Sequence, residues 1–172
     1  MQDAKVEVFP YLPEWPGQFE SEARVLRSVL APWLIGDIEH IGSTAVAGLS
    51  AKPVIDIMAS IRSLQEARSA IDALARLNYV HFPYKQDEMH WLCKPSPSLR
   101  THHLHLVPAG SDLWHSRLAF RDALRRQPTL AAEYTQLKAK LAAAHPYDRE
   151  AYTEGKSAFI QGVLTAVARS AA

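Results

Sequence analysis

The apolar residues in the first part of the chain recur with the periods of both helices and strands. Four of them are spaced three or four residues apart: Phe19, Ala23, Leu26 and Leu30. This spacing predicts a helix from about residue 17, and Pro32 would end it. A second helix is predicted from Ser63, which forms a capping box with Glu66, to a left-handed stop at Asn78.

Short apolar or alternating runs predict six strands. They cover residues 5–9, 35–41, 54–60, 79–84, 90–93 and 101–107. Short turn-forming segments at 85–88 and 94–98 join the last three runs. Because such short connections join neighbouring antiparallel strands, these three runs predict an antiparallel meander.

After residue 110 the pattern becomes helical. Ser111 can cap a first helix that ends before Pro128, a second helix ends at Pro146, and Asp148 can cap a third. The sequence therefore predicts one α+β domain over residues 1–172. Its first part, 1–110, holds a mixed, mainly antiparallel sheet with packed helices, and 111–172 forms a helical C-terminal part.

Composition limits the class of protein. The chain is 48% apolar and 22% charged, which is typical of a soluble globular domain, and its formal net charge of +1 disfavours nucleic acid and anionic membranes as partners. No apolar segment approaches the length of a membrane span. A single cysteine, Cys93, excludes an internal disulfide and suits a reducing compartment. We expect a cytoplasmic protein, and the sequence leaves its oligomeric state open.

Asp56 is the most unusual residue, because it interrupts an apolar strand between Ile55 and Ile57. An unpaired buried carboxylate costs several kcal/mol. A metal ion, a basic partner or solvent in a cleft must therefore compensate its charge. We predict a functional Asp56, with a structural pairing to Lys52 or an arginine as the alternative.

A Gly-Ser turn precedes that strand. Gly42, Ser43 and Thr44 can bring backbone and hydroxyl groups close to a phosphate, although a simple turn would have the same sequence. His40 beside the turn and Lys52 after it are further candidates for phosphate binding. So is Arg121, one helical turn from Arg117.

His103 and His105 alternate along the last predicted strand and would share one of its faces. Two histidines at this spacing can bind a divalent metal or contact phosphate, or can simply be solvated. A histidine-triad hydrolase would need a third alternating histidine, and Val107 stands at that position. With Asp56 on a neighbouring strand, the pair would complete a site for Mg²⁺ or Mn²⁺, with Zn²⁺ as an alternative.

Six motifs, in order along nearly the whole chain, resemble those of the GrpB family. They are Pro10-Tyr11 with Trp15-Pro16, His40–Val46, Lys52–Ile57, His103–His105, Leu118–Asp122 and Tyr152–Lys156. Ala47 departs from the pattern, which has a proline at that position. The family is placed in the nucleotidyltransferase superfamily, and similar domains occur fused to dephospho-coenzyme A kinases.

The resemblance implies a polymerase-β-like nucleotidyltransferase fold, with Gly42-Ser43 as its signature and Asp56 on its carboxylate strand. The wider superfamily has a pair of acids on that strand, whereas Val54 and Met58 flank Asp56 here. Two functions follow as hypotheses. One is metal-dependent transfer of a nucleotidyl or related phosphoryl group to a small acceptor, and the other is binding of a nucleotide or phosphorylated metabolite without turnover.

Overall fold

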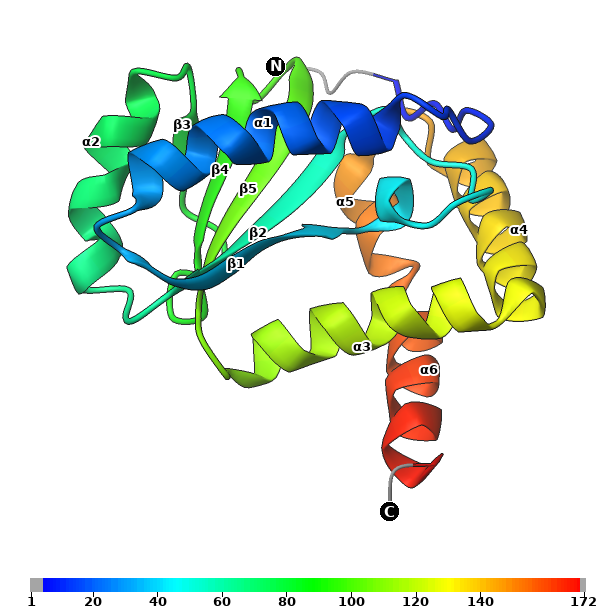
Figure 1. Ribbon diagram of the computed structural model, residues 1–172. Helices are drawn as coiled ribbons and strands as arrows, with labels where there is room; N and C mark the ends of the chain where they lie inside the picture. The colour runs from blue at the N-terminus through cyan, green and yellow to red at the C-terminus, as the bar shows by residue number, and fades with distance from the viewer. Residues whose placement is uncertain (1–4, 171–172) are drawn as a thin grey trace.

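The structure, a computed structural model that describes residues 5–170, is the predicted α+β fold (Figure 1). It contains a five-stranded sheet with the strand order β1-β2-β5-β4-β3. The strands are β1 Leu34–Ile41, β2 Ile55–Ile61, β3 Val80–Phe82, β4 His90–Pro95 and β5 Arg100–Pro108.

The sheet is mixed and mainly antiparallel, as the sequence predicts. Strands β3, β4 and β5 form the expected antiparallel meander, and β1 pairs antiparallel with β2. The single parallel pair joins β2 to β5 at the centre of the sheet. This crossover brings two chemically unusual strands, which are far apart in the sequence, into direct contact.

Within residues 5–170, six α-helices and two short 3₁₀ turns accompany the sheet. They are α1 Trp15–Leu30, η1 Ser43–Ala45, η2 Glu66–Ser69, α2 Ala70–Ala75, α3 Asp112–Arg126, α4 Pro128–Ala144, α5 Arg149–Glu154 and α6 Ser157–Ser170. The single helix expected after Asp148 is therefore wrong, because the chain breaks there into α5 and α6. Within residues 5–170, no helix combines the length and hydrophobicity needed to cross a membrane.

Two further predictions need correction. Residues 5–8 form no strand, because the Val6 amide donates to the Pro146 carbonyl, and only Phe9 makes a bridge, to Ala51. The helix predicted from Ser63 is shortened to η2 and α2. The Ser63 hydroxyl does accept the Glu66 amide, but the Glu66 carboxylate pairs with Arg62 and does not complete the capping box.

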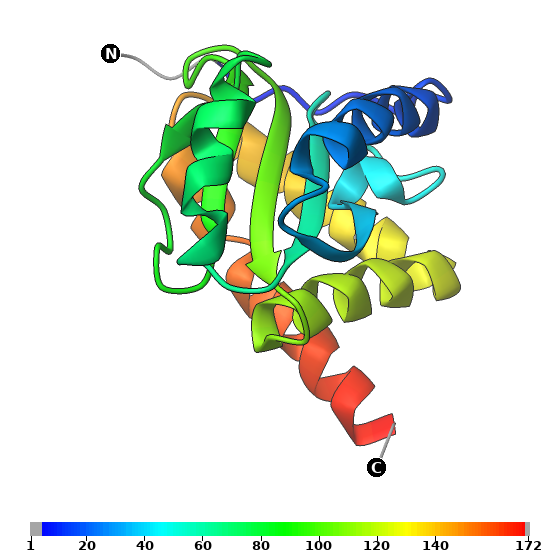
Figure 2. The same cartoon turned by 60° about the vertical axis from the view of Figure 1, so that its left-hand side comes forward.

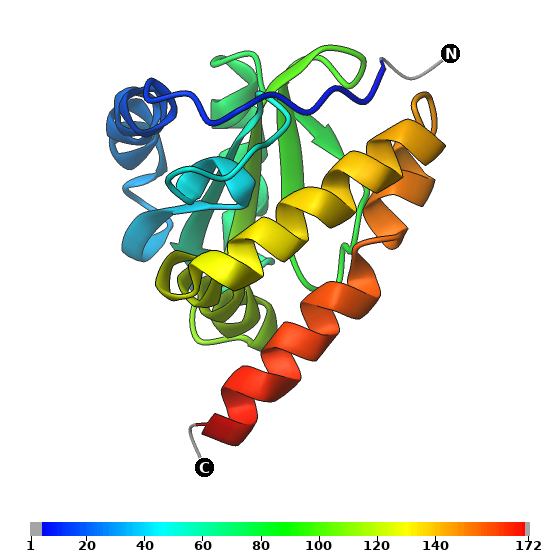
Figure 3. The same ribbon diagram turned by 90° about the vertical axis from the view of Figure 1, so that its right-hand side faces the viewer.

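The two faces of the sheet are covered by different helices. Figure 2 shows α1 and α2 in front of the sheet, with α4 and α5 behind it. The first face forms the main core with residues such as Ile57, Leu104 and Leu106. On the second face Met58 and Val107 pack near α3, and α4 to α6 extend this layer (Figure 3). Asp56 and Met58 lie two residues apart in β2, so their side chains point to the same face of the sheet. Asp56 therefore faces this second layer.

Candidate functional site

The register of three strands gathers the predicted chemistry at one level of the sheet. Ile41 of β1 lies opposite Asp56 of β2, which lies opposite His103 of β5. Gly42 follows Ile41 directly, so the Gly-Ser turn begins beside Asp56. His105, two residues along β5, shares the face of His103. The parallel β2–β5 pairing thus joins two motifs that the sequence separates by more than forty residues.

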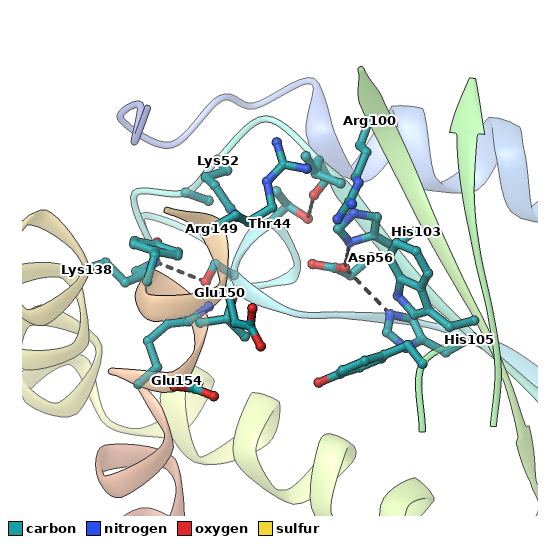
Figure 4. A pocket seen from close by; sticks show the side chains of 18 of the residues that line it. Thr44, Lys52, Asp56, Arg100, His103, His105, Lys138, Arg149, Glu150 and Glu154 are labelled. Atoms are coloured by element: carbon teal, nitrogen blue, oxygen red, sulfur yellow. Dashed lines mark hydrogen bonds and ion pairs between the residues drawn. The ribbon is translucent and has the colours of Figure 1, made fainter. Parts of the chain in front are cut away.

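Asp56, His103 and His105 form a compact triad (Figure 4). Nδ1 of His103 lies 2.8 Å from Oδ1 of Asp56, and Nε2 of His105 lies 3.7 Å from the same oxygen. One donor atom from each side chain lies within 4.8 Å of the other two. Bound zinc lies about 2.0–2.2 Å from each nitrogen or oxygen ligand in a tetrahedral site, which puts two such ligands roughly 3.3–3.6 Å apart. Coordination of one ion would therefore lengthen the His103–Asp56 contact and shorten the widest separation in the triad.

The electrostatics of the triad favour a charged carboxylate beside a neutral imidazole. Burial alone would raise the pKa of Asp56, but its interactions with His103 and His105, led by the His103 hydrogen bond, outweigh burial and hold this pKa well below its usual range. Burial lowers the pKa of His105 to about 4. Nδ1 of His105 lies 3.3 Å from the Met89 sulfur, and its buried Nε2, 3.7 Å from Oδ1 of Asp56, makes no hydrogen bond. That orphaned nitrogen fits a metal ligand.

The Gly-Ser turn is shaped to lie against Asp56. Gly42 has φ +71°, and a Cβ atom there would lie 2.5 Å from Oδ2 of Asp56. The turn then enters η1, where Lys138 of α4 donates to the Ser43 hydroxyl over 3.0 Å and to the Ser50 carbonyl. Burial lowers the pKa of Lys138 to about 7. Lys138, thirty residues after the end of the last strand, therefore fixes the turn.

The triad and the turn line one cavity of about 570 Å³ between the sheet and the C-terminal helices. Six cationic side chains line it: Lys52, Arg100, Arg117, Lys138, Arg149 and Lys156. Three carboxylates face them, from Asp56, Glu150 and Glu154. Aromatic rings of Phe82, Tyr84, Trp91 and Tyr152 complete the wall. The excess of positive charge suits an anionic ligand.

Only some of the predicted phosphate-binding residues line the cavity. Ser43, Thr44 and Lys52 line the cavity. His40 lies behind the turn, where Nε2 is 3.0 Å from the Thr44 hydroxyl and the ring stacks on Phe19. His40 is buried, and burial lowers its pKa to about 4. In this structure it supports the turn from the core side.

Arg121 is held away from the cavity. Its guanidinium donates to Glu39 at 2.6 Å, to Asp122 at 2.8 Å and to the His40 carbonyl at 3.1 Å. Its neighbour Arg117, one turn earlier on α3, is the arginine that lines the cavity.

The sequence assigned no role to four cavity residues of the helical C-terminal part: Lys138, Arg149, Tyr152 and Lys156. One signal was available for Lys138. It follows Tyr134 by four residues and precedes Leu141 by three, so it lies on the apolar stripe of its helix. Arg149 is the first residue of α5 and Lys156 lies just after its end, and their spacing carries no comparable signal.

Comparisons with known proteins agree with this architecture. A family model described as GrpB protein matches residues 5–166. The crystal structure of conserved protein GrpB from Enterococcus faecalis superposes with a TM-score of 0.86 at 33% identity, over 95% of this chain and 98% of that one. Glutamate-rich protein GrpB of Alkalihalophilus pseudofirmus is 32% identical over 87% of this chain and 88% of its own.

Other relatives are longer than this chain. A UPF0157 protein of Pseudomonas aeruginosa is 39% identical over 94% of this chain, which spans 67% of that relative. UPF0157 protein YqkA of Bacillus subtilis is 36% identical over 91% of this chain, which spans 46% of that protein. The names of these relatives describe no reaction.

Proposed function

The chain belongs to the GrpB family, and we propose that it is a metal-dependent transferase that moves a nucleotidyl or related phosphoryl group to a small acceptor. One observation carries the proposal. A carboxylate and two imidazoles converge beside a Gly-Ser turn, inside a cavity whose lining is rich in cations. A purely structural Asp56 would need one basic partner and would not need a second histidine, whose Nε2 lies 3.7 Å from the carboxylate without a hydrogen bond.

The turn would bind the phosphates of the donor. Gly42 brings the backbone close to Asp56, and Lys138 and His40 fix the hydroxyl groups of Ser43 and Thr44. In the transfer, an acceptor oxygen would form a bond to the transferred phosphorus while the bond from that phosphorus to the leaving phosphate breaks. The acceptor's proton would pass to solvent.

Asp56, His103 and His105 would hold the metal ion, which when bound neutralises charge on the transferred phosphoryl group. Two imidazoles with one carboxylate favour Mn²⁺ or Zn²⁺ over Mg²⁺, since imidazole suits transition metals whereas Mg²⁺ prefers oxygen ligands. The neutral state of His105 leaves a lone pair on Nε2 for a metal, when Nδ1 carries the proton toward Met89.

The test is a thermal-melt screen with Mg²⁺, Mn²⁺ and Zn²⁺, each with and without nucleotides and coenzyme A precursors. A ligand that binds only the folded state raises the melting temperature. We expect a metal-dependent nucleotide shift in wild type that is lost in Asp56→Asn. The exposed Asp37 of β1 provides the matched control, because Asp37→Asn changes the charge equally and should retain the shift. An equal shift in both variants would refute the assignment.

A second candidate function is nucleotide or phosphometabolite binding without turnover. The observation that favours it is the single carboxylate of the triad, because Val54, directly before β2, and Met58, within it, occupy the positions of a second acid. Tight, metal-dependent nucleotide binding with no product, across a panel of acceptors, would select this function over the transferase.

A further inference from the structure

We propose that the acceptor carries a phosphate group of its own, bound at a second anion subsite formed by Lys52, Arg149 and Lys156 around Tyr152. This inference rests on the proposed transferase function and names its acceptor class. The subsite lies on the wall formed by α5 and by the loop after η1. It is separate from the triad, whose ligands come from β2 and β5.

Arg149 provides the first observation. Its Nε and Nη1 atoms are buried and have no hydrogen-bond partner, although the side chain lines the cavity. Buried polar atoms are nearly always paired in folded proteins. A guanidinium with unpaired donors matches the planar, two-point recognition of a phosphate. The structure therefore holds Arg149 ready for an anion that approaches from the cavity.

Lys52 and Lys156 provide the second observation. Both ammonium groups lie over the ring of the buried Tyr152, 4.7 Å and 4.6 Å from its centre. Each lines the cavity, and burial together with neighbouring cations lowers the pKa of Lys52 to about 8. Two ammonium groups against one ring repel each other, and an anion between them would relieve that repulsion.

The nearby carboxylates compensate this charge only in part. Asp56 is engaged by His103 and His105, and its charge acts to raise the pKa values of Lys52 and Lys156 but does not offset their burial. Glu150 and Glu154 also line the cavity, but both residues are exposed, and no ion pair within residues 5–170 joins either one to Lys52, Arg149 or Lys156. Three cations gathered at one wall suit a dianionic phosphate monoester better than a carboxylate.

The position of the subsite explains why it would serve the acceptor. Figure 4 shows Lys52 and Arg149 on the far side of the cavity from His105. A donor phosphate bound at the Gly-Ser turn lies beside the triad. A second phosphate on the α5 wall would orient the remainder of its molecule toward the triad across the cavity. A phosphorylated acceptor fits that arrangement.

The test uses inorganic phosphate as the probe, with EDTA present so that the metal site plays no part. We expect phosphate to raise the melting temperature of wild type and of Asp56→Asn, more than acetate does at equal ionic strength. Arg149→Gln should weaken phosphate binding about tenfold or more, because it removes charge-assisted hydrogen bonds. Lys156→Gln should weaken it in the same direction, without altering α5 itself.

The control is Arg24→Gln, an equal charge change at an exposed position of α1, which should bind phosphate as wild type does. Equal phosphate binding by the Arg149, Lys156 and Arg24 variants would overturn the subsite, and so would an equal response to acetate. Loss of the metal-dependent nucleotide shift concerns the triad alone. Metal-free phosphate binding that depends on Arg149 would survive that loss, so the two proposals can fail separately.

Discussion

Gly42 shows how one residue can set the geometry of the site. Its φ of +71° and ψ of −172° lie in a region almost reserved for glycine, and its missing side chain is what lets Asp56 come close. Gly48, six residues later, also has a positive φ, of +78°, but nothing lies within 4 Å of where its Cβ would be. Substitutions at the two glycines therefore distinguish the cost of backbone strain, which both share, from the effect of contact with Asp56, which only Gly42 has.

We predict that Gly42→Ala costs more stability than Gly48→Ala. Both variants should lose about 1–3 kcal/mol through an unfavourable backbone conformation. Gly42→Ala should lose more, and should also lose metal-dependent ligand binding, because the new methyl group displaces the Asp56 carboxylate. Chemical denaturation and a Mn²⁺ titration of both variants measure these effects. Normal metal binding in Gly42→Ala would show that the turn does not position Asp56.

At the residue level, the sequence predicted the strand residues better than the helix residues. The alternation of His103 and His105 and the parity of Asp56 with Met58 follow directly from strand geometry, and the structure shows both. Arg149 and Lys156 reach the cavity only through the packing of α5 against the rest of the molecule. Side-chain periodicity does not encode such packing.

The break between α5 and α6 is the clearest difference between the helices predicted from the sequence and those in the structure. A continuous helix was predicted from Asp148, but Gly155 ends α5 in close contact with α4. A Cβ atom on Gly155 would overlap the side chain of Leu141 and lie 3.2 Å from the Ala151 carbonyl. Tertiary packing thus decides where this helix ends, which local helix propensity cannot show. The break also turns Lys156 toward the cavity.

Alanine substitutions at two further glycines should change the stability of the protein in opposite directions. Gly155→Ala should destabilise the protein by about 1–3 kcal/mol, because it overpacks the contact between α5 and Leu141. Gly162→Ala in α6 should stabilise it by about 0.5–1 kcal/mol, because the site is open and alanine favours a helix interior. Equilibrium unfolding checks both signs. Equal changes in the free energy of unfolding of the two variants would contradict the close packing at Gly155.

At the scale of the whole molecule, the cavity exists because elements from both ends of the chain meet over one face of the sheet. The strands supply Asp56, His103 and His105, while α3 to α5 and the loop after η1 supply most of the cations. The sequence predicted the strands that carry Asp56 and the two histidines, and Tyr152–Lys156 is one of the motifs that resemble the family. Neither indicated that this segment closes the cavity. A long-range contact of this kind becomes visible only in the fold.

This assembly predicts that phosphate affinity falls as the pH rises. The pKa values of Lys52 and Lys156 are both lowered to about 8, mainly by burial, so each lysine loses its proton between about pH 7 and 9. A bound anion favours the protonated forms, so affinity should fall by at most about tenfold per pH unit for each proton taken up. Calorimetry at pH 8 in two buffers of different ionisation enthalpy should show proton uptake. Lys156→Met should reduce it.

The most direct test of the central claim is a crystal structure of the protein soaked with Mn²⁺, with anomalous diffraction used to locate the ion. The account predicts a single strong anomalous peak between the Asp56 carboxylate, His103 and His105, within bonding distance of all three. A structure with Mn²⁺ elsewhere, and with the His103–Asp56 hydrogen bond intact at 2.8 Å, would contradict a metal-dependent site at this position.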